Sequence, residues 1–258
     1  MKFMLIHTVD ESTLPDTRDG GTGEALTAWI DEMLARGVVL DGARLRPVSD
    51  ATTVRAGSGS PVVTDGPFAE TKEQVAGYDV IECPDLDSAV AVAAAHPTAD
   101  VGAIEVRPFA EGMPDPEVPD EPADGRLRYL MLVCADMRRA ARAATQDQTG
   151  DPAVEAAEGN DGDDGDDGDD GDGEIDAWIA DAGSRRLYGW PLEHPDRAVT
   201  VRRVDGRVVT TDGPFAETKE QVAGYDLLEC ADLDDALEVA SGHPVAHGGA
   251  IELRPLWR

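Results

Sequence analysis

The stretch TDGPFAETKEQVAGYD occupies residues 64–79, and the same letters occur again at residues 211–226. Around this stretch the copies stay 147 residues apart, from the block 51–107 to the block 198–254. Because no insertion or deletion falls inside these blocks, we infer that they were duplicated as one folded unit. The chain is therefore a tandem repeat, and residues identical in both copies are candidates for a shared constraint.

The repeat divides the 258 residues into two units of a size typical of small domains. We place the first unit at residues 1–110 and the second at 127–258, with a linker rich in Pro, Asp and Glu at 111–126. The second unit carries an Asp/Gly-rich insert at about 137–173 that we expect to be disordered. Its GDD triplets place glycine at position 3 or 5 of any calcium loop, which excludes that kind of site.

Composition limits the partners of this protein. Its 53 acidic and 22 basic residues give a net charge of −31, which argues against nucleic acid and anionic membranes as direct partners. We find no signal peptide or membrane span, so we expect a cytoplasmic protein. The three cysteines are too few for a disulfide framework, and we expect buried, apolar thiols.

Periodicity predicts an α+β unit in each copy. In the first strand Phe3, Leu5 and His7 share one face and Met4 and Ile6 the other, a pattern typical of a central strand with helices on one side and a partner sheet on the other. The elements expected in copy one are a strand at 2–9, a helix with its apolar stripe at 26–34, an extended piece at 38–40, a hairpin of 51–55 and 61–64, a strand at 75–83, a helix capped by Asp85 and ended by His96-Pro97, and a strand at 102–108.

The DGPF turns, residues 65–68 and 212–215, have strong turn chemistry. Aspartate can bond its own downstream backbone, glycine admits a positive φ and proline fixes φ while removing a donor. We expect Phe68 to be buried as the anchor of its turn, and a role in fold and subunit packing is more plausible for this motif than direct catalysis.

The DGPF–A–ETKE run, the short first strand and the closing GAIEVRP at 102–108 resemble the DGPF subgroup of the YCII-related proteins. The resemblance implies ferredoxin-like α+β units that pair into a dimeric α+β barrel, so we expect the two halves to form an internal pseudo-dimer within a monomer. It also implies an accessory or regulatory module, linked to sigma-factor-dependent transcription through protein contacts.

Other members of that family resemble one another in a histidine on the first helix and an aspartate near the end of the second. Here the first helix has no histidine in either copy, and the second ends in His96 or His243. The dyad is therefore not carried over by the resemblance.

Polar residues identical in both copies supply the candidate site. Histidine titrates near neutral pH and arginine forks around anions, so we select catalytic and ligand-binding candidates by these chemistries. The catalytic candidates are His96 and His243, and the ligand-binding candidates are Arg55, Asp65, Tyr78, Arg107, Arg202, Asp212, Tyr225 and Arg254.

Structural roles remain open for the same residues. Each histidine could cap a helix end, Glu70 and Glu73 around Lys72 could form a solvated charged turn, and Arg107 could pair with Glu105 or Glu82. No histidine–carboxylate spacing is typical of a metal site, and no motif implies a cofactor. As the alternative to a regulatory module, we expect a protein that binds or transforms a small anionic or carbonyl compound in a cleft between the repeats.

Overall fold

The structure, a computed structural model, describes residues 1–13, 23–56, 60–136 and 170–257. The strands and helices of the first repeat are β1 (Lys2–Val9), α1 (Glu24–Ala35), β2 (Val39–Arg44), β3 (Thr52–Arg55), β4 (Val62–Asp65), β5 (Gln74–Glu82), α2 (Leu86–Ala95) and β6 (Gly102–Pro108). Those of the second are β7 (Leu127–Ala135), α4 (Asp170–Ala182), β8 (Arg186–Pro191), β9 (Val199–Val204), β10 (Arg207–Asp212), β11 (Gln221–Cys230), α5 (Leu233–Ser241) and β12 (Ala250–Pro255).

The strands form two antiparallel sheets, and each sheet contains a hairpin from the other repeat. The first sheet has the order β10-β9-β6-β1-β5-β2, and the second has the order β4-β3-β12-β7-β11-β8. The hairpin β3–β4 therefore pairs with β12 of the second repeat, and β9–β10 pairs with β6 of the first. The sequence predicted the hairpin but not this exchange, so the repeat boundary near residue 110 does not coincide with a boundary between sheets.

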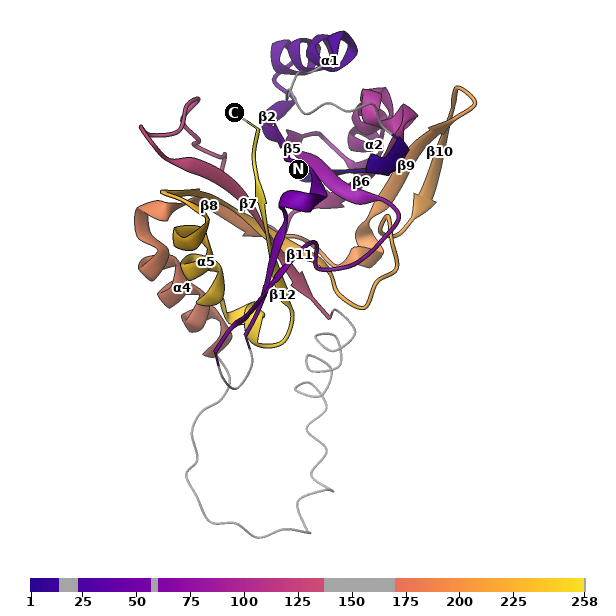
Figure 1. The fold of residues 1–258 in the computed structure, drawn as a ribbon. Coiled ribbons are helices and arrows are strands. Elements are labelled where there is room, and N and C mark those ends of the chain that lie inside the picture. The colour runs from indigo at the N-terminus through magenta and orange to yellow at the C-terminus, as the bar shows by residue number, and fades with distance from the viewer. Residues whose placement is uncertain (14–22, 57–59, 137–169, 258) are drawn as a thin grey trace, which may run out of the picture.

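The sheets are packed between two layers of helices (Figure 1). Met4 and Ile6 of β1 point into a core shared with Leu130 and Leu132 of β7. The alternate residues of β1 face α1 and α2 on the outside, and α4 and α5 cover the second sheet in the same way. This confirms the two-faced burial predicted for the first strand.

The residues that cap the helices and form the turns are those that the sequence predicted. Asp85 caps α2 by accepting a hydrogen bond from the backbone N–H of Ser88 at 2.8 Å, and His96 ends that helix. Gly37 follows α1 with φ +65°, and Asp205-Gly206 turn the β9–β10 hairpin with φ 51° and 73°. The three cysteines are buried and free, as expected.

Three expectations were wrong in detail. The extended piece at 38–40 is the start of a longer strand, β2. Leu34 is exposed, because it lies beside the buried stripe of α1 that Trp29 and Met33 occupy. Residues 170–173, which we expected to be disordered, open α4. The rest of the insert, 137–169, lies outside the described residues.

The linker contacts both repeats. Lys2 of β1 donates to the carbonyl of Met113 at 2.7 Å, and Met113 is buried in the core between the sheets. Near the other end Glu229 of β11 accepts the backbone N–H of Ala123 at 3.2 Å. Among the described residues, no helix is long and apolar enough to cross a membrane.

Candidate functional site

A cluster of buried polar side chains lies under the helices of the first repeat. His7 is on β1, Asp79 is on the neighbouring β5, and His96 follows α2. One ligand atom from each side chain lies within 4.8 Å of the other two, and all three residues are buried. The Nε2 of His7 is 3.0 Å from Asp79 Oδ2, and the Nε2 of His96 is 3.9 Å from the same oxygen.

The polar atoms of this cluster lie close together, but several of them form no hydrogen bond within the described residues. His7 Nε2 and Asp79 Oδ2 are buried and lie 3.0 Å apart without hydrogen-bond geometry, and the indole N–H of Trp29 on α1 has no hydrogen-bond partner among the described residues. The Trp29 and His7 rings lie 4.4 and 4.3 Å from the ring of His96. Buried polar atoms without hydrogen bonds are costly, so this cluster is a candidate site.

The ring of His96 has a defined tautomer. Its Nδ1 accepts the backbone N–H of Thr98 at 3.0 Å, so in the neutral ring the hydrogen is on Nε2. Burial, together with the neighbouring His7, lowers the pKa of His96 to about 2, so the ring is neutral at physiological pH. A histidine that binds a metal through one nitrogen normally donates from the other. His96 therefore presents an N–H donor to the cluster and does not suit a metal ligand.

The second repeat has the same aspartate in a different setting. Strand register places Val133 at the position of His7, opposite Ile251 as His7 is opposite Ile104. Asp226 instead pairs with Arg186 of β8, whose Nε lies 2.6 Å from Asp226 Oδ1. Burial raises the pKa of Asp226 to about 6, and Arg186 opposes that rise.

The counterparts of Trp29 and His96 in the second repeat, Trp178 and His243, both have hydrogen-bond partners. The indole N–H of Trp178 donates to the carbonyl of Val239 at 2.9 Å, and His243 Nδ1 accepts the N–H of Val245 at 3.1 Å. Burial lowers the pKa of His243 to about 4. The catalytic candidates His96 and His243 thus have the same helix-capping role, but only His96 belongs to a cluster with unpaired polar atoms among the described residues.

A glycine on the adjacent strand positions each aspartate. A Cβ at Gly42 would lie 2.2 Å from Asp79 Oδ1, and one at Gly189 would lie 2.0 Å from Asp226 Oδ1. The carboxylates occupy the space of the missing side chains, which explains a glycine inside β2 and β8.

The predicted anion clamps are engaged within the protein. Arg107 and Arg254 are completely buried, and they pair with Glu105 and Glu252 on their own strands. Of the two partners proposed for Arg107, the structure has Glu105, whereas Glu82 is exposed. Each arginine also donates to backbone carbonyls of the other repeat, Arg107 to Val222 at 3.0 Å and Arg254 to Val75 at 2.7 Å.

The same glutamates hold the DGPF turns. Glu252 accepts the backbone N–H of Phe68 at 2.9 Å, and Glu105 accepts that of Phe215 at 3.0 Å. Each turn is therefore docked on the closing strand of the other repeat. Phe68 itself is only partly buried against the central core.

The remaining candidates do not converge on one cleft. Arg55 pairs with Glu220 and Arg202 with Glu73, across the repeats, with N–O distances of 2.5 Å. Glu73 thus takes part in a defined ion pair, while Glu70 and Lys72 are exposed, as a solvated turn predicts. Asp65 and Asp212 are also exposed.

Tyr78 and Tyr225 meet in the core between the sheets, with ring centroids 5.5 Å apart. The hydroxyls of Tyr78 and Tyr188 both donate to Asp41 Oδ2, at 2.8 and 2.6 Å, and Tyr225 donates to Tyr188 at 2.8 Å. Burial, with the charge of Asp41, raises the pKa of Tyr78, Tyr188 and Tyr225, so these phenols act as hydrogen-bond donors.

Sequence reasoning missed His7, Asp79, Asp41 and Tyr188. Asp79 was among the residues identical in both copies. Gly42, the glycine that gives its carboxylate room, also recurs in the second copy as Gly189 and was a second signal. His7, Asp41 and Tyr188 could not be found in this way, because their counterparts are Val133, Tyr188 and Asp41 respectively.

Comparison with known proteins agrees with the duplication. A model of the YCII-related domain matches residues 1–111 and again 176–258. The uncharacterized protein R00369 of Rhizobium meliloti (strain 1021) is 46% identical over 70 residues, which are 26% of this chain and 56% of that protein. The chain therefore spans about half the length of this relative.

Proposed function

This chain belongs to the YCII-related domain family, and we propose that it is a small-molecule enzyme whose acid–base site is the polar cluster of its first repeat. One observation carries the proposal. His7 Nε2, Asp79 Oδ2 and His96 Nε2 converge in copy one without hydrogen bonds between them, whereas copy two has Val133 and the Asp226–Arg186 ion pair at the same place.

The proposed reaction is proton transfer next to a carbonyl group. The His7–Asp79 pair takes the proton from carbon, and the Nε2–H of His96 donates to the carbonyl oxygen, on which negative charge develops. Returning the proton restores the pair. Because the Asp79 carboxylate repels anions, this site favours the carbonyl compound over the anionic compound of the original hypothesis.

The test is proton exchange in D2O, followed by ¹H NMR with the uncharged carbonyl compounds acetone, butanone and dihydroxyacetone as probes. We expect the protein to catalyse deuterium incorporation next to the carbonyl. His7→Gln and Asp79→Asn should lower the rate at least ~100-fold, in line with typical acid–base contributions.

Two matched controls are available. His243→Gln alters the equivalent histidine of copy two, and His194→Gln alters a histidine whose side chain is 42% exposed. Both should keep the full rate. Equal rates in wild type and His7→Gln would refute the role of the cluster, and no exchange with any probe would refute the carbonyl class.

The exposed edges of the sheets favour the second candidate function, an accessory module that contacts a sigma factor. The outer strands β4 and β10 expose Val62, Val63, Val208 and Val209, with exposed fractions of 44–57%. Edge strands with free backbone groups can pair with an extended segment of another protein. The test is titration with a purified extracytoplasmic-function sigma factor. The sigma factor should bind wild type at least ~10-fold more tightly than it binds the Val208→Lys variant. Equal affinity would exclude this edge.

We also infer that the halves form an internal counterpart of a dimeric α+β barrel, with 1–110 and 127–258 as its two units. The exchanged hairpins and the core shared by β1 and β7 support this arrangement.

A further inference from the structure

A cavity of about 470 Å³ lies between the two repeats and the linker. Its wall combines Asp41 and Tyr78 of the first repeat, Leu227 and Trp257 of the second, linker residues 120–126 and the first two residues of β7. The volume is within the range of small-molecule sites. Tyr78 is the only one of the predicted ligand-binding residues that lines it, and the cavity is on the opposite face of the first sheet from the His7 cluster.

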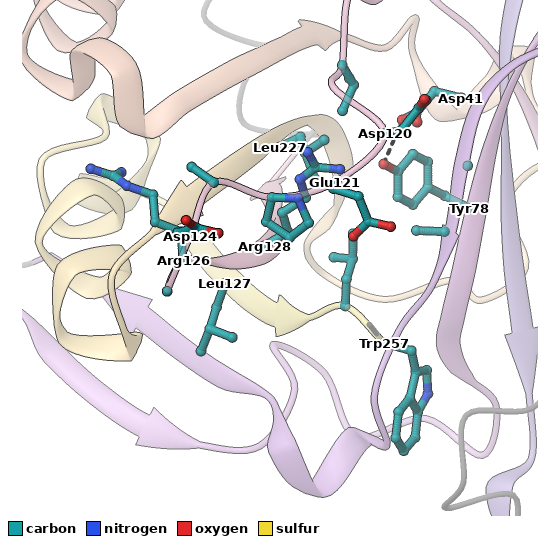
Figure 2. A pocket seen from close by; sticks show the side chains of 17 residues that line it. Asp41, Tyr78, Asp120, Glu121, Asp124, Arg126, Leu127, Arg128, Leu227 and Trp257 are labelled. Carbon is teal, nitrogen blue, oxygen red and sulfur yellow. Dashed lines mark hydrogen bonds between the residues drawn. The ribbon is translucent and has the colours of Figure 1, made fainter.

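Asp41 is oriented at one end of this cavity. Figure 2 shows the hydroxyl of Tyr78 pointing at the Asp41 carboxylate, with Arg126 at the opposite end. Tyr78 and Tyr188 both donate to Oδ2, and within the described part of the chain Oδ1 accepts no hydrogen bond. One carboxylate oxygen is thus held in place by two phenols, and the other remains available to a ligand.

The charges of the wall favour a cation. Asp120, Glu121 and Asp124 add three carboxylates to that of Asp41. The two arginines of the wall are engaged elsewhere, since Arg126 donates to the carbonyl of Glu229 at 2.8 Å and Arg128 pairs with its carboxylate at 3.1 Å. The net charge of −31 also concentrates cations near the protein.

We propose that this cavity binds an organic cation, a primary amine on an apolar or aromatic body. The ammonium group pairs with Asp41 Oδ1, and the body packs against Leu227 and the aromatic rings of Tyr78 and Trp257. This site is independent of the acid–base site proposed above, because it uses none of its residues.

The proposal is tested by calorimetric titration with 2-phenylethylamine, 3-phenylpropanoate and 2-phenylethanol, which share a body and differ in charge. We expect the amine to bind at least ~10-fold more tightly than either of the others. Asp41→Asn keeps an acceptor for both tyrosines and should weaken amine binding at least ~10-fold, while Asp87→Asn, on the exposed first turn of α2, should leave it unchanged.

A second variant checks the location without altering Asp41. Ala123→Trp places a large side chain in the linker wall and should also reduce binding at least ~10-fold. Binding of the acid as tight as that of the amine, undiminished amine binding in both variants, or no binding of the amine at all would each overturn the proposal.

Discussion

The buried aspartate of each repeat has a basic partner, but the partner comes from a different strand in each copy. Asp79 lies beside His7 of β1, and Asp226 pairs with Arg186 of β8. Desolvating a carboxylate costs several kcal/mol, which explains why neither repeat leaves it alone. Between the copies the partner changes from a histidine, which can gain and lose a proton, to an arginine, which stays charged. The first repeat therefore has a site able to exchange a proton, and the second does not.

This compensation can be tested by transplanting the first arrangement into the second repeat. Arg186→Val should lower the free energy of unfolding by about 3 kcal/mol or more, because it leaves Asp226 buried without a counter-charge. Adding Val133→His should recover a large part of the lost free energy of unfolding, as measured by urea denaturation. If the double variant is no more stable than Arg186→Val, the histidine and the arginine are not equivalent partners.

The caps formed by histidine predict a pH dependence. The folded-state pKa of His243 is about 4, below the ordinary 6.5, so the unfolded chain takes up a proton before the folded one does. The stability from the neutral ring is therefore present above pH 6.5 and is lost as pH falls toward 4. His243→Asn keeps the capping acceptor and should remove about 2–3 kcal/mol of the destabilisation that wild type suffers between pH 7 and 4.5.

His194 provides the control for that measurement. Its Nδ1 caps a backbone N–H in the same way, that of Asp196 at 3.3 Å, but its side chain is 42% exposed. His194→Asn should leave the pH dependence of urea unfolding unchanged. If the free energy of unfolding of His243→Asn falls with pH as steeply as that of wild type, the His243 ring is not the source of this pH dependence.

At the scale of elements, β6 and β12 have an unusual content for central strands. Each has a completely buried arginine next to a buried glutamate, and the pair binds backbone groups of the other repeat. The closing GAIEVRP strand and the DGPF turn are therefore two sides of one interface, which gives a physical reason for their occurrence in the same sequence.

Removing one glutamate should show the strength of that interface. Glu105→Ala leaves Arg107 buried without its carboxylate and the N–H of Phe215 without its acceptor, so we expect a loss of about 3–5 kcal/mol in the free energy of unfolding. Glu82→Ala removes an exposed glutamate at the end of β5 and should change the free energy of unfolding by less than about 0.5 kcal/mol. Similar losses in the two variants would assign no special role to the buried pair.

The elements themselves were largely predictable, because their signals are local. The alternation of β1, the Asp85 cap and the Asp205-Gly206 turn depend on neighbouring residues. The exchange of hairpins could not be predicted, because β3 and β9 have the same sequence pattern whichever sheet they join. The His7 site was missed for another reason: comparing the copies selects what they share, and this site depends on positions where they differ.

At the scale of the whole molecule, the exchange makes each sheet dependent on both halves of the chain. The first sheet ends in β10-β9, and the second in β4-β3. A half on its own would lose a hairpin and would expose the core that β1 and β7 share. Covalent continuity through the linker is then less important for cohesion than the strand pairs and the buried ion pairs between repeats.

A cut in the linker tests this directly. A protease site inserted between Pro116 and Glu117, both in the connecting segment, allows the folded chain to be cleaved. We expect the two fragments to remain together and to sediment as one species close to 27.3 kDa, because strand pairing and the central core hold them. They should separate only in denaturant. Fragments that separate under native conditions would show that the linker, and not the exchanged hairpins, holds the halves together.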